Sequence, residues 1–82
     1  MKHAWDVLNE IEWRKGYDLA KIVIYYHDRV ESRLMELSGD RIESWDKSFI
    51  YTVLGSAIPF HRVQNIYYGD LEVYARRAKK KL

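Results

Sequence analysis

The feature that most constrains the fold of this chain is the run Leu19–Tyr26, which reads LAKIVIYY and is rich in β-branched and aromatic residues. Such side chains suit a half-buried pleated sheet better than a helix. The run predicts a strand over residues 18–26 that is buried along most of its length. This strand ends by delivering two polar residues, His27 and Arg29, to one edge of the predicted sheet.

An amphipathic helix is predicted before this strand, over residues 3–14. Its apolar residues recur at the i, i+3, i+4, i+7 spacing of one helix face, namely Ala4, Val7, Leu8 and Ile11. Gly16 follows at a position suited to ending a helix.

Further strands are predicted along the rest of the chain. They cover residues 48–54, residues 57–67 (entered through Pro59) and residues 71–76, whereas residues 32–37 and 41–45 fit either a strand or a helical turn. The sum is an α+β fold, in which the N-terminal helix packs on a small, curved, mostly antiparallel sheet or partly open barrel of four to five strands.

The length of 82 residues allows one domain, residues 1–82, and the charge along it is uneven. Residues 76–82 form a basic tail that carries five positive charges, whereas residues 1–75 hold nine Lys and Arg against twelve Asp and Glu. Such a tail either contacts phosphates of nucleic acid or serves as a frayed, solubilising terminus.

The sequence argues against several classes of protein. There is no apolar run long enough for a membrane span, no signal-peptide core, no cysteine and no spacing that demands a metal. Phosphate loops and nucleophile elbows are also missing. We therefore expect a cytoplasmic protein without a cofactor, a metal site or assigned catalytic residues.

Two histidines, each close to an arginine, are the best candidates for chemistry. His27 stands near Arg29, and His61 stands beside Arg62. Imidazoles can serve as acid and base or donate hydrogen bonds to a phosphate, and a guanidinium matches phosphate oxygens. Within a strand over residues 57–67, alternation separates His61 from Arg62, which predicts that His61 works with His27 and that Arg62 serves the fold or a neighbouring face. Tyr68 stands beside a glycine turn and is expected to be exposed.

These residues belong to a pattern that resembles a known family. The pattern comprises YHDR at residues 26–29, SGDRI at residues 38–42, IPFHRV at residues 58–63, Gly69-Asp70 and a closing strand that ends at Arg76. Over roughly residues 5–77 it resembles the archaeal RNA cyclic group end recognition domain. The resemblance implies RNA binding at ends that bear cyclic or related phosphates, with RNA-processing enzymes as partners. It also implies a role for His27, Arg29, His61 and Arg62. The family usually has glycine directly after histidine-arginine, whereas Asp28 intervenes here.

The leading hypothesis is an RNA-binding domain for single-stranded or phosphate-bearing ends. The residues assigned to RNA are His27, Arg29, His61, Arg62, Tyr68 (stacking on bases), Arg76, Arg77, Lys79 and Lys80. One alternative is an RNA cyclic phosphodiesterase that uses the two histidines as acid and base. Another is a protein-interaction module that forms a homodimer through the face of Tyr67 and Tyr68.

Overall fold

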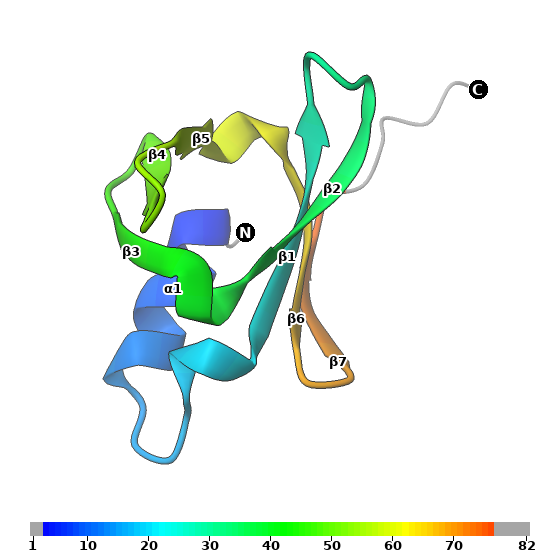
Figure 1. Cartoon of the computed structure of the whole chain (residues 1–82). Coiled ribbons are helices and arrows are strands. Elements are labelled where there is room, and N and C mark those ends of the chain that lie inside the picture. Colours follow the sequence, from blue (N-terminus) through cyan, green and yellow to red (C-terminus); the bar gives the residue numbers. More distant parts are fainter. Residues whose placement is uncertain (1–2, 77–82) are drawn as a thin grey trace, which may run out of the picture.

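The N-terminal helix packs against two antiparallel sheets in the computed structural model, which describes residues 3–76 (Figure 1). The helix and strands are α1 (Ala4–Trp13), β1 (Ile22–Asp28), β2 (Arg33–Ser38), β3 (Ile42–Trp45), β4 (Phe49–Thr52), β5 (Ala57–Pro59), β6 (Val63–Tyr68) and β7 (Leu71–Ala75). Three short 3₁₀ turns lie between them: η1 (Leu19–Lys21), η2 (Gly39–Arg41) and η3 (Phe60–Arg62).

The chain crosses between the sheets twice. One sheet has the strand order β2-β1-β6-β7 and the other the order β3-β4-β5, and every paired strand is antiparallel to its neighbour. The chain leaves the first sheet through η2 and returns to it through η3. The predicted α+β class and the antiparallel, unclosed sheet architecture are confirmed, although the described residues form seven strands rather than four or five.

The higher strand count has two causes: η3 divides one predicted strand in two, and both segments that fit either a strand or a helical turn form strands, β2 and β3. The predicted strand over residues 57–67 is wrong at its centre, because η3 separates β5 from β6. The predicted strand over residues 18–26 likewise begins with η1, where the Asp18 carboxylate accepts a hydrogen bond from the amide of Ala20. Each turn is followed directly by a buried β-branched residue: Ile22, Ile42 or Val63.

The core lies between the two sheets and is closed by α1. The predicted apolar face of the helix is confirmed, because Ala4, Val7, Leu8 and Ile11 are all buried. They join buried residues from both sheets, among them Ile24, Ile50, Ile58, Phe60 and Ile66. Trp45 packs against this cluster and its indole nitrogen donates to the Asn9 side chain at 2.8 Å.

One glycine allows the first two 3₁₀ turns to pack together. Gly39 opens η2 and is buried, and a Cβ at this position would lie 1.9 Å from the carbonyl oxygen of Leu19 in η1. Only glycine, which has no Cβ, therefore allows the two backbones to come this close. The contact fixes η2, and with it Arg41, at one end of the space between the sheets.

Candidate nucleic-acid interface

A cleft of about 480 Å³ opens between the tip of the β1–β2 hairpin and the segment that joins β5 to β6. We call it the cationic cleft. Its lining residues are Tyr26, His27, Asp28 and Arg29 from β1 and the following turn, Ser56, Ala57, Ile58 and Pro59 from β5 and its approach, and Arg62 from η3. The unclosed seam between the two sheets thus gathers residues that lie more than 25 positions apart in the sequence.

Arg62 reaches this cleft because it ends a turn rather than continuing a strand. Pro59 is extended and precedes the three-residue turn Phe60–Arg62, whose buried Phe60 anchors it in the core. The Nε atom of Arg62 is buried and has no hydrogen-bond partner among the described residues. Burying such a donor without a partner is unfavourable. No described residue accepts a hydrogen bond from the rest of the guanidinium either, so its other N–H groups can bind an acceptor in the cleft.

The hairpin turn that carries Arg29 is held together by Asp28. One carboxylate oxygen of Asp28 accepts from the amides of Val30 at 2.8 Å and Glu31 at 3.3 Å, and its carbonyl accepts from Ser32 at 2.8 Å. The aspartate that departs from the family pattern therefore has a structural role in shaping the turn.

The same carboxylate affects its neighbour Tyr26. Burial raises the pKa of the Tyr26 phenol above its ordinary value of 10.0, and the negative charge of Asp28 raises it further. The Tyr26 hydroxyl therefore stays protonated near neutral pH, and it can donate a hydrogen bond into the cleft.

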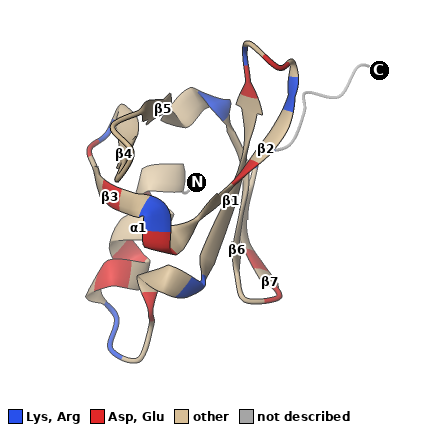
Figure 2. Cartoon of the chain, in the orientation of Figure 1, with Lys and Arg blue, Asp and Glu red and all other residues tan. Residues whose placement is uncertain are grey.

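The cleft has an excess of positive charge. Arg29 and Arg62 line it together with one carboxylate, that of Asp28, and within residues 3–76 no ion pair engages either arginine. Figure 2 shows a basic residue on the turn between β5 and β6, and both basic and acidic residues at the hairpin tip. His27 adds an imidazole to the same lining. This set of donors suits an anion with several acceptor oxygens.

His61 does not line the cationic cleft. It is exposed on η3, and its carbonyl accepts a hydrogen bond from the guanidinium of Arg76. Arg76 is also joined to Gln64, since its amide donates to the Gln64 carbonyl and its own carbonyl accepts from the Gln64 side chain, each at 2.8 Å. The pairing expected from strand alternation is thus reversed: because residues 60–62 form a turn, Arg62 rather than His61 joins His27.

Tyr68 lies away from the cleft and is half-buried, so its predicted exposure is wrong. Its hydroxyl accepts from the amide of Asp18 at 2.8 Å, and its ring lies 5.0 Å from that of Tyr17. Tyr68 therefore ties the segment before η1 to the end of β6. Tyr67 and Tyr68 do not share a face, because Tyr67 packs edge-on against Tyr25 instead.

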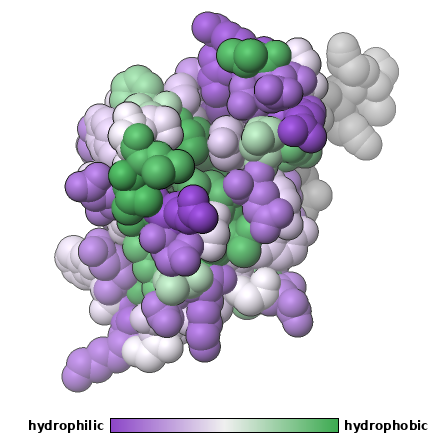
Figure 3. All heavy atoms as spheres, viewed as in Figure 1, coloured by the Kyte–Doolittle hydropathy of each residue, from purple (hydrophilic) through white to green (hydrophobic). Residues whose placement is uncertain are grey.

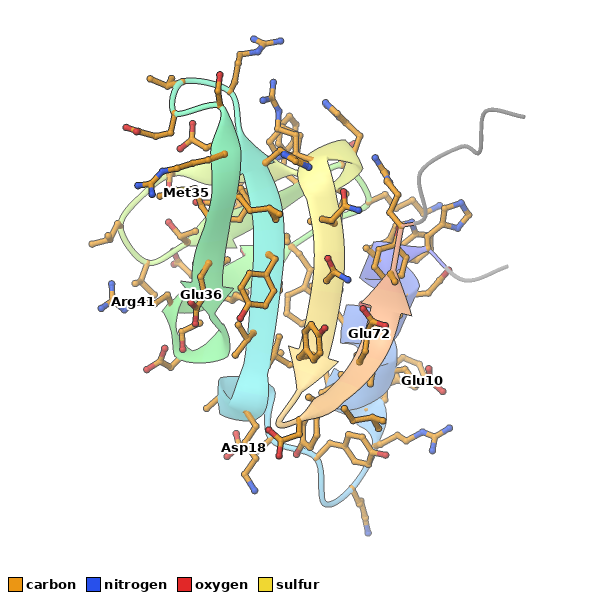
Figure 4. The ribbon with its side chains drawn as sticks, turned by 90° about the vertical axis from the view of Figure 1, so that its right-hand side faces the viewer. Glu10, Asp18, Met35, Glu36, Arg41 and Glu72 are labelled. Carbon is orange, nitrogen blue, oxygen red and sulfur yellow. The ribbon has the colours of Figure 1, made fainter. Side chains whose placement is uncertain are left out.

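The outer face of the four-stranded sheet is a second surface with aromatic residues (Figure 4). The rings of Tyr25 and Tyr67 lie 5.9 Å apart there, and the Asn65 amide donates to the Glu72 carboxylate. Strand alternation in β1 and β6 was the signal that could have singled out this tyrosine pair.

Other predicted features are placed as follows. Arg77, Lys79 and Lys80 lie outside the described residues. Across residues 3–76, no group of three or more His, Asp or Glu is arranged to hold a metal ion. In the same part of the chain, no helix combines the length and the apolar character needed to cross a membrane.

The matches to known proteins cover the whole described domain. The sequence matches the family model of the MJ1316 RNA cyclic group end recognition domain over residues 1–77. A UPF0248 protein of Archaeoglobus fulgidus is 38% identical over 69 residues, which cover 84% of this chain and 99% of the relative. A UPF0248 protein of Metallosphaera sedula is 33% identical over 76 residues, which cover 93% of this chain and 95% of the relative. No solved structure matches. The chain belongs to the RNA cyclic group end recognition domain family.

Proposed function

We propose that this domain binds RNA and that its cationic cleft holds a phosphate group at the RNA end. One observation carries the proposal: the residues His27, Arg29 and Arg62 line a single cleft, and no side chain among them has a hydrogen bond or ion pair to another described residue. A buried cationic group normally has a carboxylate or carbonyl partner, and the buried Nε of Arg62 has none among the described residues. The name of the matching family supports an RNA end as the ligand.

The chemistry of the cleft fits a cyclic or terminal phosphate. A guanidinium offers a planar set of donors that can bind two phosphate oxygens at once, so Arg29 and Arg62 can each take one edge of the group. The imidazole of His27 and the hydroxyl of Tyr26 supply further donors. A cyclic phosphate keeps two non-bridging oxygens and one negative charge, which the two arginines are enough to balance.

Residues outside the cleft are proposed to contact the rest of the RNA. His61 and Arg76 lie together on the outside of η3, and the basic residues Arg77, Lys79 and Lys80 follow in the sequence. They would bind backbone phosphates without regard to the chemistry at the end. Deleting residues 77–82 should therefore weaken binding equally for RNAs with different ends and make it less sensitive to salt.

Fluorescence anisotropy with one RNA sequence bearing three different 3′ ends tests the proposal. The ends are 2′,3′-cyclic phosphate, 3′-phosphate and hydroxyl. The intact protein is expected to prefer both phosphate ends. Arg62→Gln should reduce that preference by roughly tenfold or more, because it removes a charge-assisted hydrogen bond.

Lys21 provides the matched control, because it is the last residue of η1 as Arg62 is of η3, yet it does not line the cleft. Lys21→Gln should leave the preference for phosphate ends unchanged. Equal affinity of the intact protein for all three RNAs, or equal effects of the two substitutions, would refute phosphate recognition in the cleft.

A further inference from the structure

A second hollow of about 420 Å³ continues from the cationic cleft along the seam between the sheets. The two share three lining residues, Tyr26, Ser56 and Ile58, so they form one groove. One wall of the groove comes from β1 and β2, and the other from β4, β5 and their connection. No strand pairing joins these two walls in the described structure, which leaves the groove open to a ligand.

Each end of this groove lies at a chain crossing and carries an arginine. Arg62 ends η3, where the chain returns to the first sheet, and Arg41 ends η2, where the chain leaves it. Arg41 lines the second hollow, and its side chain has no hydrogen bond or ion pair to another described residue. The groove is therefore bounded by guanidinium groups at both ends.

The register of the hairpin gives the length of the groove. Asp28 pairs with Arg33 near the cationic cleft, and Val23 pairs with Ser38 near η2. These pairs are separated by five residues, or about 17 Å at the usual rise of a strand. A single nucleotide is too short to contact both ends, whereas a short single strand of RNA is long enough.

The second hollow is apolar on the β4–β5 side. Leu54 lies there with 80% of its surface exposed, close to the buried Ile58. Figure 3 shows hydrophobic surface gathered over the three-stranded sheet on the face that is viewed in Figure 1. Glu36 also lines this hollow, but it pairs with Tyr25 and precedes the buried Leu37, so its side chain lies on the outer face of the four-stranded sheet (Figure 4). The exposed apolar surface of Leu54 suits a nucleoside rather than a second phosphate.

We infer that the groove binds a short single-stranded RNA end rather than an isolated phosphate or nucleotide. The terminal phosphate occupies the cationic cleft, a nucleoside lies against Leu54, and a phosphate further along the strand binds Arg41. This inference rests on the proposed function and adds a second anchoring point to it. Selectivity for polymers over free cyclic nucleotides follows, because only a polymer reaches Arg41.

Two probes separate the inference from the proposed function: adenosine 2′,3′-cyclic monophosphate and a five-nucleotide oligoadenylate with the same cyclic end. Binding is measured by calorimetry and by anisotropy over a range of salt concentrations. Arg41→Gln is expected to weaken pentamer binding about fivefold and to reduce the slope of log K against log salt by about 0.7, the value for one contact to a single-stranded phosphate. Its affinity for the mononucleotide should not change.

Matched control variants show whether an effect is specific to residues that line the groove. Lys21→Gln removes the equivalent cation of η1, outside the groove, and should not alter the pentamer affinity as Arg41→Gln does. Leu54→Ser should weaken pentamer binding, whereas Leu71→Ser, which changes another exposed leucine outside the groove, should not. Both leucines are exposed, so folding is expected to survive and is verified by circular dichroism.

The possible results are distinguishable. If Arg62→Gln weakens binding of both probes while Arg41→Gln matches Lys21→Gln, the groove inference is wrong and the phosphate site stands. If Arg62→Gln affects neither probe, the proposed function fails together with the inference. If Arg41→Gln weakens the mononucleotide as much as the pentamer, Arg41 belongs to the phosphate site and the two-anchor arrangement is refuted.

Discussion

Gly39→Ala is expected to destabilise the domain severely although it adds only one methyl group. The added Cβ would lie 1.9 Å from the carbonyl oxygen of Leu19, 3.0 Å from its carbonyl carbon and 3.1 Å from the Cβ of Ile22. Two of these atoms belong to the backbone of η1, so no side-chain rotation relieves the clash. The turns η1 and η2 must move apart, which disturbs the buried Ile22 at the start of β1.

The magnitude follows from how far the chain must move. Placing the Cβ at an ordinary contact distance of about 3.5 Å requires a shift of more than an ångström between two packed turns. Overpacking in a core usually costs about 1 to 3 kcal/mol, and a clash between backbones belongs at the upper end or beyond. A loss of about 3 kcal/mol would lower the melting temperature of a domain of this size by roughly 12 to 24 °C.

Urea and thermal unfolding followed by circular dichroism measure this loss, with Gly55→Ala as the control. Gly55 has a positive φ of 92° but no atom within 4 Å of the added Cβ, so its substitution reports backbone strain alone. We expect about 1 to 2 kcal/mol for Gly55→Ala. If Gly39→Ala costs no more than Gly55→Ala, then the packing of η1 against η2 does not set the position of the second turn.

Three further predictions concern hydrogen-bonded polar side chains. Amides of Phe49 and Ser48 and the hydroxyl of Tyr51 hold the pKa of Asp46 below its ordinary value of 3.8, so this carboxylate stabilises the fold above that pH and the contribution is lost as the pH falls through its folded-state pKa. The urea midpoint of Asp46→Asn should fall less than that of the unmodified protein between about pH 5 and about pH 2, and parallel curves would contradict this. Trp45→Phe leaves the Asn9 acceptor unpaired and should cost about 1 to 2 kcal/mol in urea unfolding, whereas an unchanged midpoint would show that water replaces the indole. Tyr68→Phe should speed hydrogen exchange at the amide of Asp18 without unfolding β6, and unaltered exchange would rule out this bond as the tie.

Periodicity was sufficient to predict the elements that bury one continuous face. The helix over residues 3–14 and the strand that ends near Tyr26 were both recognisable, because one apolar stripe or one β-rich run decides each of them. The segments over residues 32–37 and 41–45 remained ambiguous for a physical reason. Residues 32–37 form most of β2, an edge strand in which only Leu37 is buried, so alternation leaves little signal there. Residues 41–45 lie at a crossing between the sheets, where β3 is only four residues long.

The placement of Arg62 could not be predicted from alternation, and the error shows which information was missing. Alternation assumes an unbroken strand, but Pro59 precedes a turn in which Phe60 turns into the core. The sequence contains a repeated pattern that indicates this turn. In SGDRI and PFHRV alike, a basic residue stands directly before the β-branched residue that opens the next strand, as Lys21 does before Ile22.

The three 3₁₀ turns show that the same local structure can have different roles at different positions in the fold. Each turn ends in a basic residue, and the residue that follows it is buried and begins a strand. Lys21 and Arg41 belong to turns that pack against each other through Gly39. Arg62 belongs to the turn at the other crossing, beside the tip of the β1–β2 hairpin, where the sheets stay unpaired. An arginine there keeps its donors free, because the open seam supplies no carboxylate that pairs with it among the described residues. A closed barrel would have paired the strands at this seam and removed the space. The incomplete closure of the barrel therefore leaves the space in which we propose that this turn binds a phosphate.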